Sequence, residues 1–186
     1  NGSYTNPATG KPFYSAAQIQ ELAQYAKQKG VELVPEINAT AQMNAIRNLF
    51  ARKDPAQADA VFDSNDTLRY ETEAGQQFMQ TLYGEAADMF ADSGTHIHIG
   101  GDAFSGSVSR NAHYIAYLNR IVLHLKGKNR TVRVWNDAIL PASLALLDNS
   151  VEITYHGRDG NRETPAQSDE NARPASVLDL IQADYT

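Results

Sequence analysis

The residues best suited to chemistry lie in one stretch, 95–104, with the sequence Thr-His-Ile-His-Ile-Gly-Gly-Asp-Ala-Phe. Polar and β-branched residues alternate over 95–99, which predicts a short strand. Gly100 and Gly101 then remove side-chain bulk at a point where a ligand could approach the backbone. Asp102 is therefore presented at the C-terminal end of a strand, the end at which parallel α/β proteins bind their ligands.

The same stretch also has a purely structural interpretation. A Gly-Gly pair after a strand is typical of a simple turn, and an acid that follows it is typical of a helix cap. An isolated match of this kind does not separate the two interpretations. The decision therefore depends on what the other strand ends carry.

Three further segments are predicted to be strands, and each ends in polar or aromatic residues. If these are ordinary loop residues, they have no common role. Parallel strands, however, place their C-terminal ends on one side of a sheet, so we favour the interpretation that they form one shared mouth with Asp102. The residues concerned are Glu36 and Asn38 after 31–37, Trp135, Asn136 and Asp137 after 131–135, and Tyr155 and His156 after 151–155.

Helical patterns alternate with these strands. Ser15 and Gln18 form the pattern of a capping box, and apolar residues every three or four positions predict helices over 15–30, 72–90 and 111–127, the last of them capped by Asn111. Shorter helices are predicted within 38–50, 141–147 and 176–183, and irregular surface segments over 51–66, 105–110 and 159–174. The alternation predicts an α/β fold with parallel strands and right-handed crossovers.

Composition is that of an ordinary globular chain. The 186 residues carry a formal charge of -6, which argues against a nucleic-acid partner, and contain no cysteine, which excludes disulfides and thiolate chemistry. No apolar run reaches the length of about 20 residues that a membrane span needs. We expect one domain, 1–186, and a first residue other than Met suggests a piece of a longer chain.

The sequence motif of the central stretch, 95–104, also resembles that of a known family. His98-Ile99-Gly100-Gly101-Asp102 resembles the His-x-Gly-Gly-Asp-Glu signature of family 20 glycoside hydrolases, the β-N-acetylhexosaminidases. The resemblance implies a (β/α)8 TIM-type barrel, of which this chain supplies a partial barrel, the central parallel strands only. Four other segments share the family's pattern in order and spacing: 6–13, 25–36, 135–137 and 152–155.

The resemblance also implies a mechanism. In this family the 2-acetamido oxygen of the sugar attacks the anomeric carbon, a substrate-assisted retaining route. Asp102 matches the carboxylate that orients the acetamide group. Ala103 occupies the position of the general-acid Glu, and its methyl group cannot donate a proton. No metal and no cofactor is implied.

Other positions match or depart from the family's substrate-binding pattern. Trp135 and Tyr155 match the aromatic wall around the sugar, and Asp137 matches the loop that follows it. Asn38, Gln42 and His156 stand where relatives usually have Asp, His and Trp. These departures, together with Ala103, predict a catalytically impaired hydrolase; the alternatives are a non-catalytic N-acetylhexosamine-binding pseudoenzyme and an inactive barrel fragment.

The expected partner is an oligo- or polysaccharide that contains N-acetylhexosamine, with no nucleic acid and no membrane. Half of a parallel barrel leaves open strand edges, so self-association or pairing with the remaining barrel strands is a further expectation. The family resemblance alone suggests a secreted or periplasmic location.

Overall fold

A computed structural model describes residues 4–5, 10, 12–64, 66–102, 108–156 and 173–185. Its centre is a sheet of four parallel strands in the order β3-β4-β5-β6, which is also their order along the chain. The four strands are β3 (Glu36–Ala39), β4 (His96–Gly100), β5 (Thr131–Trp135) and β6 (Glu152–Thr154). This is the partial barrel predicted from the sequence.

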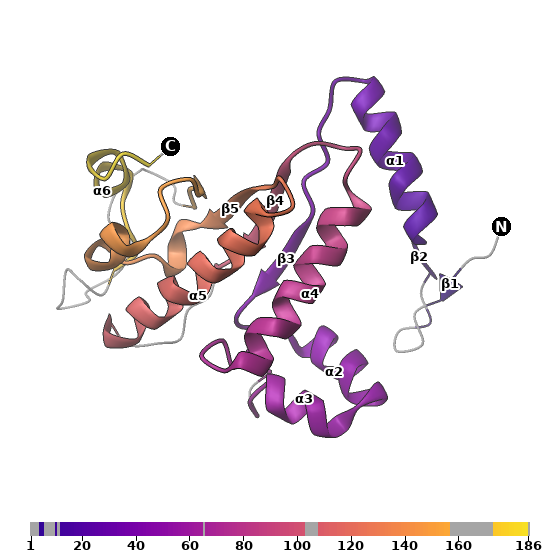
Figure 1. Ribbon diagram of the computed structural model, residues 1–186, viewed down its shortest axis with the longest axis horizontal. Helices are drawn as coiled ribbons and strands as arrows, with labels where there is room; N and C mark the ends of the chain where they lie inside the picture. The colour runs from indigo at the N-terminus through magenta and orange to yellow at the C-terminus, as the bar shows by residue number, and fades with distance from the viewer. Residues whose placement is uncertain are drawn as a thin grey trace.

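Helices connect the strands and cover one face of the sheet. Helices α4 (Glu73–Met89) and α5 (Val108–Lys126) lie side by side against the strands, whereas α1 (Ala16–Gln28) lies beyond β3 and α6 (Val177–Gln182) lies beyond β5 (Figure 1). The remaining elements are short: β1 (Tyr4–Thr5), β2 (Pro12–Phe13), α2 (Asn44–Lys53), α3 (Pro55–Val61), and the 3-10 helices η1 (Asn136–Ala138) and η2 (Pro141–Leu146).

The two faces of the sheet differ in polarity because side chains alternate along each strand. Ile97, Ile99, Val132 and Val134 point to the helical face and are almost completely buried. Burial of one such side chain contributes roughly 1.5–3 kcal/mol. The opposite face, which corresponds to the inside of the barrel, carries polar side chains: His96, His98, Arg133, Glu152 and Thr154.

The helix over β3 and β4 is anchored by a buried tyrosine. Tyr83 of α4 is fully buried, and its hydroxyl lies 3.0 Å from the carbonyl oxygen of Ile37 and 2.9 Å from that of Ile99. A buried hydroxyl needs such partners, since leaving it unpaired costs about 1–3 kcal/mol. The contact therefore fixes α4 on the ends of two adjacent strands.

The first strand of the sheet differs from the prediction. Residues 31–37 were expected to form it, but β3 begins at Glu36 and reaches Ala39. Pro35 has no N–H to give to a ladder, although its carbonyl accepts from the backbone N–H of His98 at 2.9 Å. The preceding residues are held by side chains instead: Ser93 Oγ accepts from the backbone N–H of Leu33 and donates to its carbonyl.

Three predictions about the positions of helices also need correction. The segment 51–66 was expected to be irregular, but α3 occupies part of it because Asp54 caps the helix, accepting from the N–H of Gln57 at 3.0 Å, and Pro55 suits the first helical position. Asn111 was expected to cap a helix. It lies inside α5, fully buried, and donates to the carbonyl of Ala138 at 2.8 Å, so it joins the helix to the end of η1. Since α5 begins at Val108, the irregular segment predicted for 105–110 is helical over its last three residues.

The other helices begin and end close to the predicted positions. Ser15 and Gln18 form the expected capping box on α1, and Ser176 with Asp179 forms a second one on α6. Thr72 caps α4 through its hydroxyl, which accepts from the N–H of Gly75 at 3.1 Å. Most of the loop predicted over 159–174 lies outside the described residues.

Candidate functional site

The turn after β4 requires glycine at both positions. Gly100 and Gly101 have φ values of 77° and 95°, a region that side chains rarely adopt. A Cβ atom on Gly100 would lie 2.2 Å from Asn38 Oδ1, and one on Gly101 would lie 2.8 Å from Val134 Cγ2. The backbone can therefore turn tightly beside β3, and it presents Asp102 to solvent at the end of the sheet.

Asn38 of β3 holds this turn and its acid. Its side-chain amide donates to Asp102 Oδ1 at 2.7 Å, and its Oδ1 accepts from the backbone N–H of Gly101 at 3.1 Å. Two residues predicted at different strand ends are thus in direct contact. An amide donor beside a carboxylate orients it without adding a charge of its own.

Glu36 of β3 fixes the orientation of the indole ring of Trp135, which lies at the end of β5. Its indole N–H donates to Glu36 Oε1 at 2.8 Å. The ring lies close to two histidines, with centroids 4.8 Å from the ring of His98 and 5.9 Å from that of His156. The indole is therefore fixed on one edge by a hydrogen bond and flanked by imidazoles.

The residues after β5 and β6 also meet. His156 Nδ1 lies 3.3 Å from Asp137 Oδ1, and the backbone N–H of His156 donates to Asn136 Oδ1 at 2.7 Å. Asn136 is buried and donates in turn to the carbonyl of Ala175 at 3.1 Å. His156 itself is exposed beside Trp135.

The remaining predicted site residues are less closely tied to this group. Tyr155 is half-buried and packs against the hydrophobic core, so only part of its ring is accessible. Gln42 is exposed in the loop between β3 and α2, with a φ of 59°. Ala103 lies outside the described residues, and its role stays a prediction.

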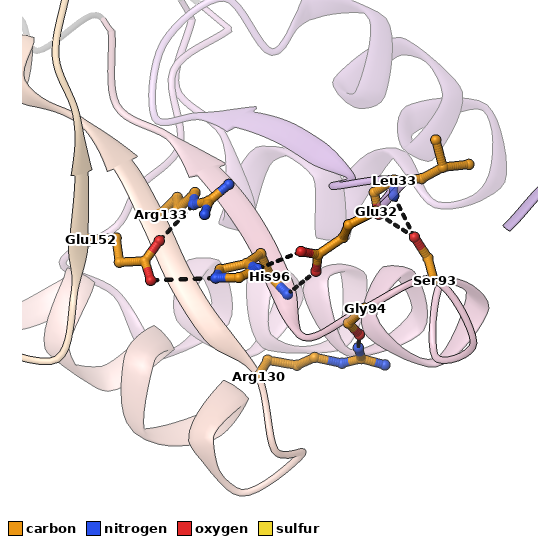
Figure 2. Close-up of polar contacts among 8 residues, drawn as sticks. All are labelled: Glu32, Leu33, Ser93, Gly94, His96, Arg130, Arg133 and Glu152. Atoms are coloured by element: carbon orange, nitrogen blue, oxygen red, sulfur yellow. Dashed lines mark hydrogen bonds and ion pairs between the residues drawn. The ribbon is translucent and has the colours of Figure 1, made fainter. Parts of the chain in front are cut away.

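The sequence interpretation missed a layer of charged residues below the mouth (Figure 2). Glu32 accepts from the backbone N–H of His96 at 2.8 Å, and its second oxygen lies 2.7 Å from His96 Nδ1. On the other side of the ring, Nε2 lies 3.3 Å from Glu152 Oε1, and Arg133 Nε donates to Glu152 Oε2 at 2.7 Å. We call these four residues, Glu32, His96, Arg133 and Glu152, the inner clamp.

The clamp shifts the ionisation of its acids. Partial burial alone would raise the pKa of Glu32, but the hydrogen bonds from the backbone and ring of His96 bring it below the ordinary value. The hydrogen bond from Arg133, with its positive charge, lowers the pKa of Glu152. Alternation along the strands was the signal that could have found this layer, because His96, Arg133 and Glu152 share the parity of His98, Trp135 and Thr154.

His98 lies directly above the clamp and beneath Trp135. The backbone N–H of Gly100 donates to its Nδ1 at 3.1 Å, and its Nε2 lies 3.1 Å from Thr154 Oγ1. Burial lowers the pKa of His98; the carboxylate of Glu36 opposes this effect and the charge of Arg133 adds to it. The ring is therefore held as a neutral imidazole.

The described ranges contain neither a metal-binding cluster nor a membrane-spanning helix. No group of three or more His, Cys, Asp or Glu side chains there is arranged to hold a metal ion. None of the helices described is long and apolar enough to cross a membrane.

Parallel strands in this order, covered by helices on one face, define a barrel-type α/β domain, and domains of this type bind their ligands at the C-terminal ends of the strands. Comparison with known proteins gives the family. The model of the glycosyl hydrolase family 20 catalytic domain matches residues 1–170. The chain therefore belongs to glycoside hydrolase family 20.

Individual relatives agree with this assignment. The crystal structure of dispersin B superposes with a TM-score of 0.87 and 32% sequence identity, covering 100% of this chain and 55% of that one. The structure of the pneumococcal exo-β-D-N-acetylglucosaminidase StrH superposes with a TM-score of 0.74 over 97% of this chain and 45% of that one; at 21% identity it supports the fold alone.

A curated relative, the lacto-N-biosidase of Bifidobacterium bifidum, is 21% identical over 171 residues, which are 81% of this chain and 15% of that protein. The chain thus spans about half the length of the dispersin B and StrH chains, and a small part of the lacto-N-biosidase.

Proposed function

We propose that residues 1–186 are a single catalytic-domain segment of a β-N-acetylhexosaminidase-like glycoside hydrolase that recognises glycans containing N-acetylglucosamine and cleaves them weakly. The observation that carries the proposal is the contact between Asn38 and Asp102 at the glycine turn. It fixes one carboxylate at the sheet edge, close to the strand end that carries Trp135.

The proposed chemistry follows from these groups. A carboxylate at Asp102 can accept the N–H of a 2-acetamido group and so orient its oxygen toward the anomeric carbon of the same sugar. The intermediate of that attack is a positively charged oxazolinium, which a neighbouring carboxylate stabilises. Trp135 offers an aromatic face on which the apolar side of a sugar ring can pack. Asn38 keeps Asp102 in the orientation that both tasks require.

Protonation of the leaving oxygen is the step this chain lacks. A general acid contributes about 10²- to 10⁴-fold to such reactions. Ala103 has no proton to give, so natural glycosides, whose leaving groups are poor, should suffer most. Aryl glycosides with nitrophenol leaving groups need little protonation and should retain more of their turnover.

The test compares 4-nitrophenyl N-acetyl-β-glucosaminide with N-acetylglucosamine oligomers, in the parent chain and in Ala103→Glu. The expected result is a larger gain on the oligomers than on the aryl glycoside. Equal effects on both substrates would count against a general-acid role for position 103. Asp102→Asn, which keeps the shape of the acid but not its charge, should abolish turnover of both.

A second candidate function is glycan binding without turnover, which the vacant acid position favours. Trp135 is the sole tryptophan, so its fluorescence reports on the mouth directly. Saturable changes on titration with N-acetylglucosamine oligomers, combined with no product after long incubation, would support this alternative. If the fluorescence shows no saturable change, both functions are contradicted, and the interpretation that remains is an inactive barrel fragment.

A further inference from the structure

His98 touches both halves of the proposed site at once. It belongs to β4 and is buried, with 6% of its surface exposed. Through Nδ1 it meets the backbone of the glycine turn that presents Asp102, and through its ring it supports the indole of Trp135.

The protonation state of this ring can be assigned from its partners. A backbone N–H can only donate, so His98 Nδ1 must offer a lone pair to Gly100. The proton of the neutral ring is therefore on Nε2, where the hydroxyl of Thr154 can accept it at 3.1 Å. Both ring nitrogens are satisfied in this tautomer and in no other.

Glu36 could accept a hydrogen bond from the protonated ring of His98. Glu36 Oε1 lies 3.6 Å from His98 Nδ1, and the same oxygen accepts the indole N–H of Trp135 at 2.8 Å. If Nδ1 gained a proton, it could no longer accept from Gly100, and it would turn its N–H toward Glu36. The imidazolium would then compete with Trp135 for one oxygen.

The charges around the His98 ring, together with its burial, determine the pH at which Nδ1 becomes protonated. Glu36 of β3 favours the protonated ring, whereas burial and Arg133 of β5 favour the neutral one, and β6 contributes the neutral hydroxyl of Thr154. Burial is the largest of these effects, so the ring stays neutral around pH 7.

We propose that His98 is a positioning residue: as the neutral Nε2–H tautomer it fixes the Gly100–Asp102 turn and the Trp135 ring together, and on protonation it releases both. The role rests on the proposed function, because it matters only if Asp102 and Trp135 hold a sugar. It makes glycan binding depend on a group that touches no substrate.

The first test uses the parent chain without ligand. Nitrogen-15 NMR should show His98 protonated on Nε2 alone at pH 7. On acidification, the His98 ring, the Gly100 amide and the Trp135 indole should change together, with one midpoint below the ordinary histidine value of about 6.5. An Nδ1–H tautomer at pH 7, or a Gly100 amide that does not follow the ring, would overturn the proposal.

The second test separates hydrogen bonding from packing. In His98→Asn the side-chain oxygen can replace Nδ1 as acceptor for Gly100 but does not titrate. In His98→Phe the ring against Trp135 is kept, and both polar atoms are lost. The Phe variant should bind N-acetylglucosamine oligomers about tenfold or more weakly at pH 7, as expected when a buried N–H loses its partner. The Asn variant should bind nearly as the parent and lose the acid dependence.

His156→Gln is the matched control, since His156 also flanks Trp135. The acid transition in tryptophan fluorescence should persist in this variant and disappear in His98→Asn; the reverse pattern would overturn the proposal. If a His98 variant does not fold, the tautomer and the shared midpoint in the parent chain still decide. A failure of oligomer binding at every pH would contradict the proposed function, whereas the measurements without ligand would still test His98.

Discussion

At the scale of single residues, the site depends on neutral groups that hold charged ones. Asn38 donates to Asp102 where an acid would repel it, and His98 accepts from Gly100 only while it is uncharged. The exposed carboxylate is thus oriented by partners that add no charge. Changing one of these neutral groups to a charged one should therefore be more harmful than removing it.

Asn38→Asp tests this directly. The substitution would place a carboxylate oxygen about where the amide now donates, 2.7 Å from Asp102 Oδ1, and two carboxylates this close repel each other until one of them binds a proton. Although relatives usually have Asp at this position, we expect oligomer affinity at pH 7 to fall by roughly tenfold or more in this chain, because its charge-assisted hydrogen bond to Asp102 becomes a repulsion. The ratio of variant to parent affinity should rise as the pH falls from 8 to 5, measured by Trp135 fluorescence.

Asn38→Ala is the control for that experiment, because it removes both hydrogen bonds without adding charge. Its loss of affinity relative to the parent should not change with pH. If the Asp and Ala variants lose affinity in parallel at every pH, the loss comes from the missing hydrogen bonds and not from charge repulsion at Asp102. If neither variant loses affinity, the contact with Asp102 is unimportant for binding.

The glycine turn gives a second prediction at this scale. Gly100→Ala would add a Cβ atom 2.2 Å from Asn38 Oδ1 and 2.5 Å from Asn38 Cα, at a φ of 77°. We expect the free energy of unfolding to fall by about 2 kcal/mol or more, measured by chemical denaturation. Gly30→Ala has a similar φ of 71° but meets nothing within 4 Å, so it should cost only about 1 kcal/mol. Equal costs would mean that the turn relaxes freely away from β3.

At the scale of secondary-structure elements, the inner clamp ties the irregular residues before β3 to β4, β5 and β6. Glu32 and Glu152 both have pKa values below the ordinary 4.5 in the folded chain. A carboxyl group with a lowered folded pKa contributes stability that is complete above its unfolded pKa. That contribution is lost as the pH falls through the folded pKa.

The free energy of unfolding should therefore decrease as the pH falls below about 4.5. Glu152→Gln should lower the stability at pH 7 by about 0.5–1 kcal/mol, the upper range for partly exposed ion pairs, and should flatten the acid decrease. Denaturation curves measured in steps from pH 7 to 3 check both effects. Glu85→Gln, at an exposed position of α4, should keep the parent profile; a parallel loss there would point to net charge rather than the clamp.

Elements with a local signal could be predicted from the sequence. The capping box at Ser15 and the apolar spacing of α4 specify those helices without reference to the rest of the chain. The start of β3 could not be predicted, because it depends on Ser93 and Glu32 replacing a strand ladder across about 60 residues. The prediction that Asn111 caps a helix was wrong for a similar reason: its partner, the carbonyl of Ala138, is 27 residues away.

The candidate site likewise has residues that could be predicted from the sequence and contacts that could not. The end of β4 and the residues after β5 follow from strand patterns, so Asp102, Trp135 and their neighbours could be named in advance. Their contacts could not, because Asn38 with Asp102 and Glu36 with Trp135 are 64 and 99 residues apart. The charged layer below the mouth was accessible in principle through strand parity.

At the scale of the whole molecule, the described sheet has four parallel strands, whereas a TIM-type barrel closes with eight. The sugar mouth in such a barrel is built from all the strand ends. A group restored at one end can act only if the other walls hold the substrate, since a misplacement of about 1 Å can cost roughly 100-fold in rate.

We therefore expect Ala103→Glu to raise hydrolysis of N-acetylglucosamine oligomers only slightly in the 186-residue chain. The gain should become clear when the remaining barrel strands are supplied, either in the same chain or as a second polypeptide. Release of N-acetylglucosamine, measured in both formats, gives the comparison. Full activity in the 186-residue chain would show that four strands suffice; no gain in the completed barrel would assign the deficit to Asn38, Gln42 and His156.

The polar inner face of the sheet also matters while the chain is being made. An apolar sheet face left uncovered on a ribosome attracts other unfinished chains, and aggregation competes with folding. Here the helices cover the apolar face, and the opposite face carries His96, Arg133 and Glu152, which pair with one another and are partly exposed to water. A partial barrel of this kind therefore exposes a hydrated face rather than an apolar one, and its open strand edges are the surfaces left for association.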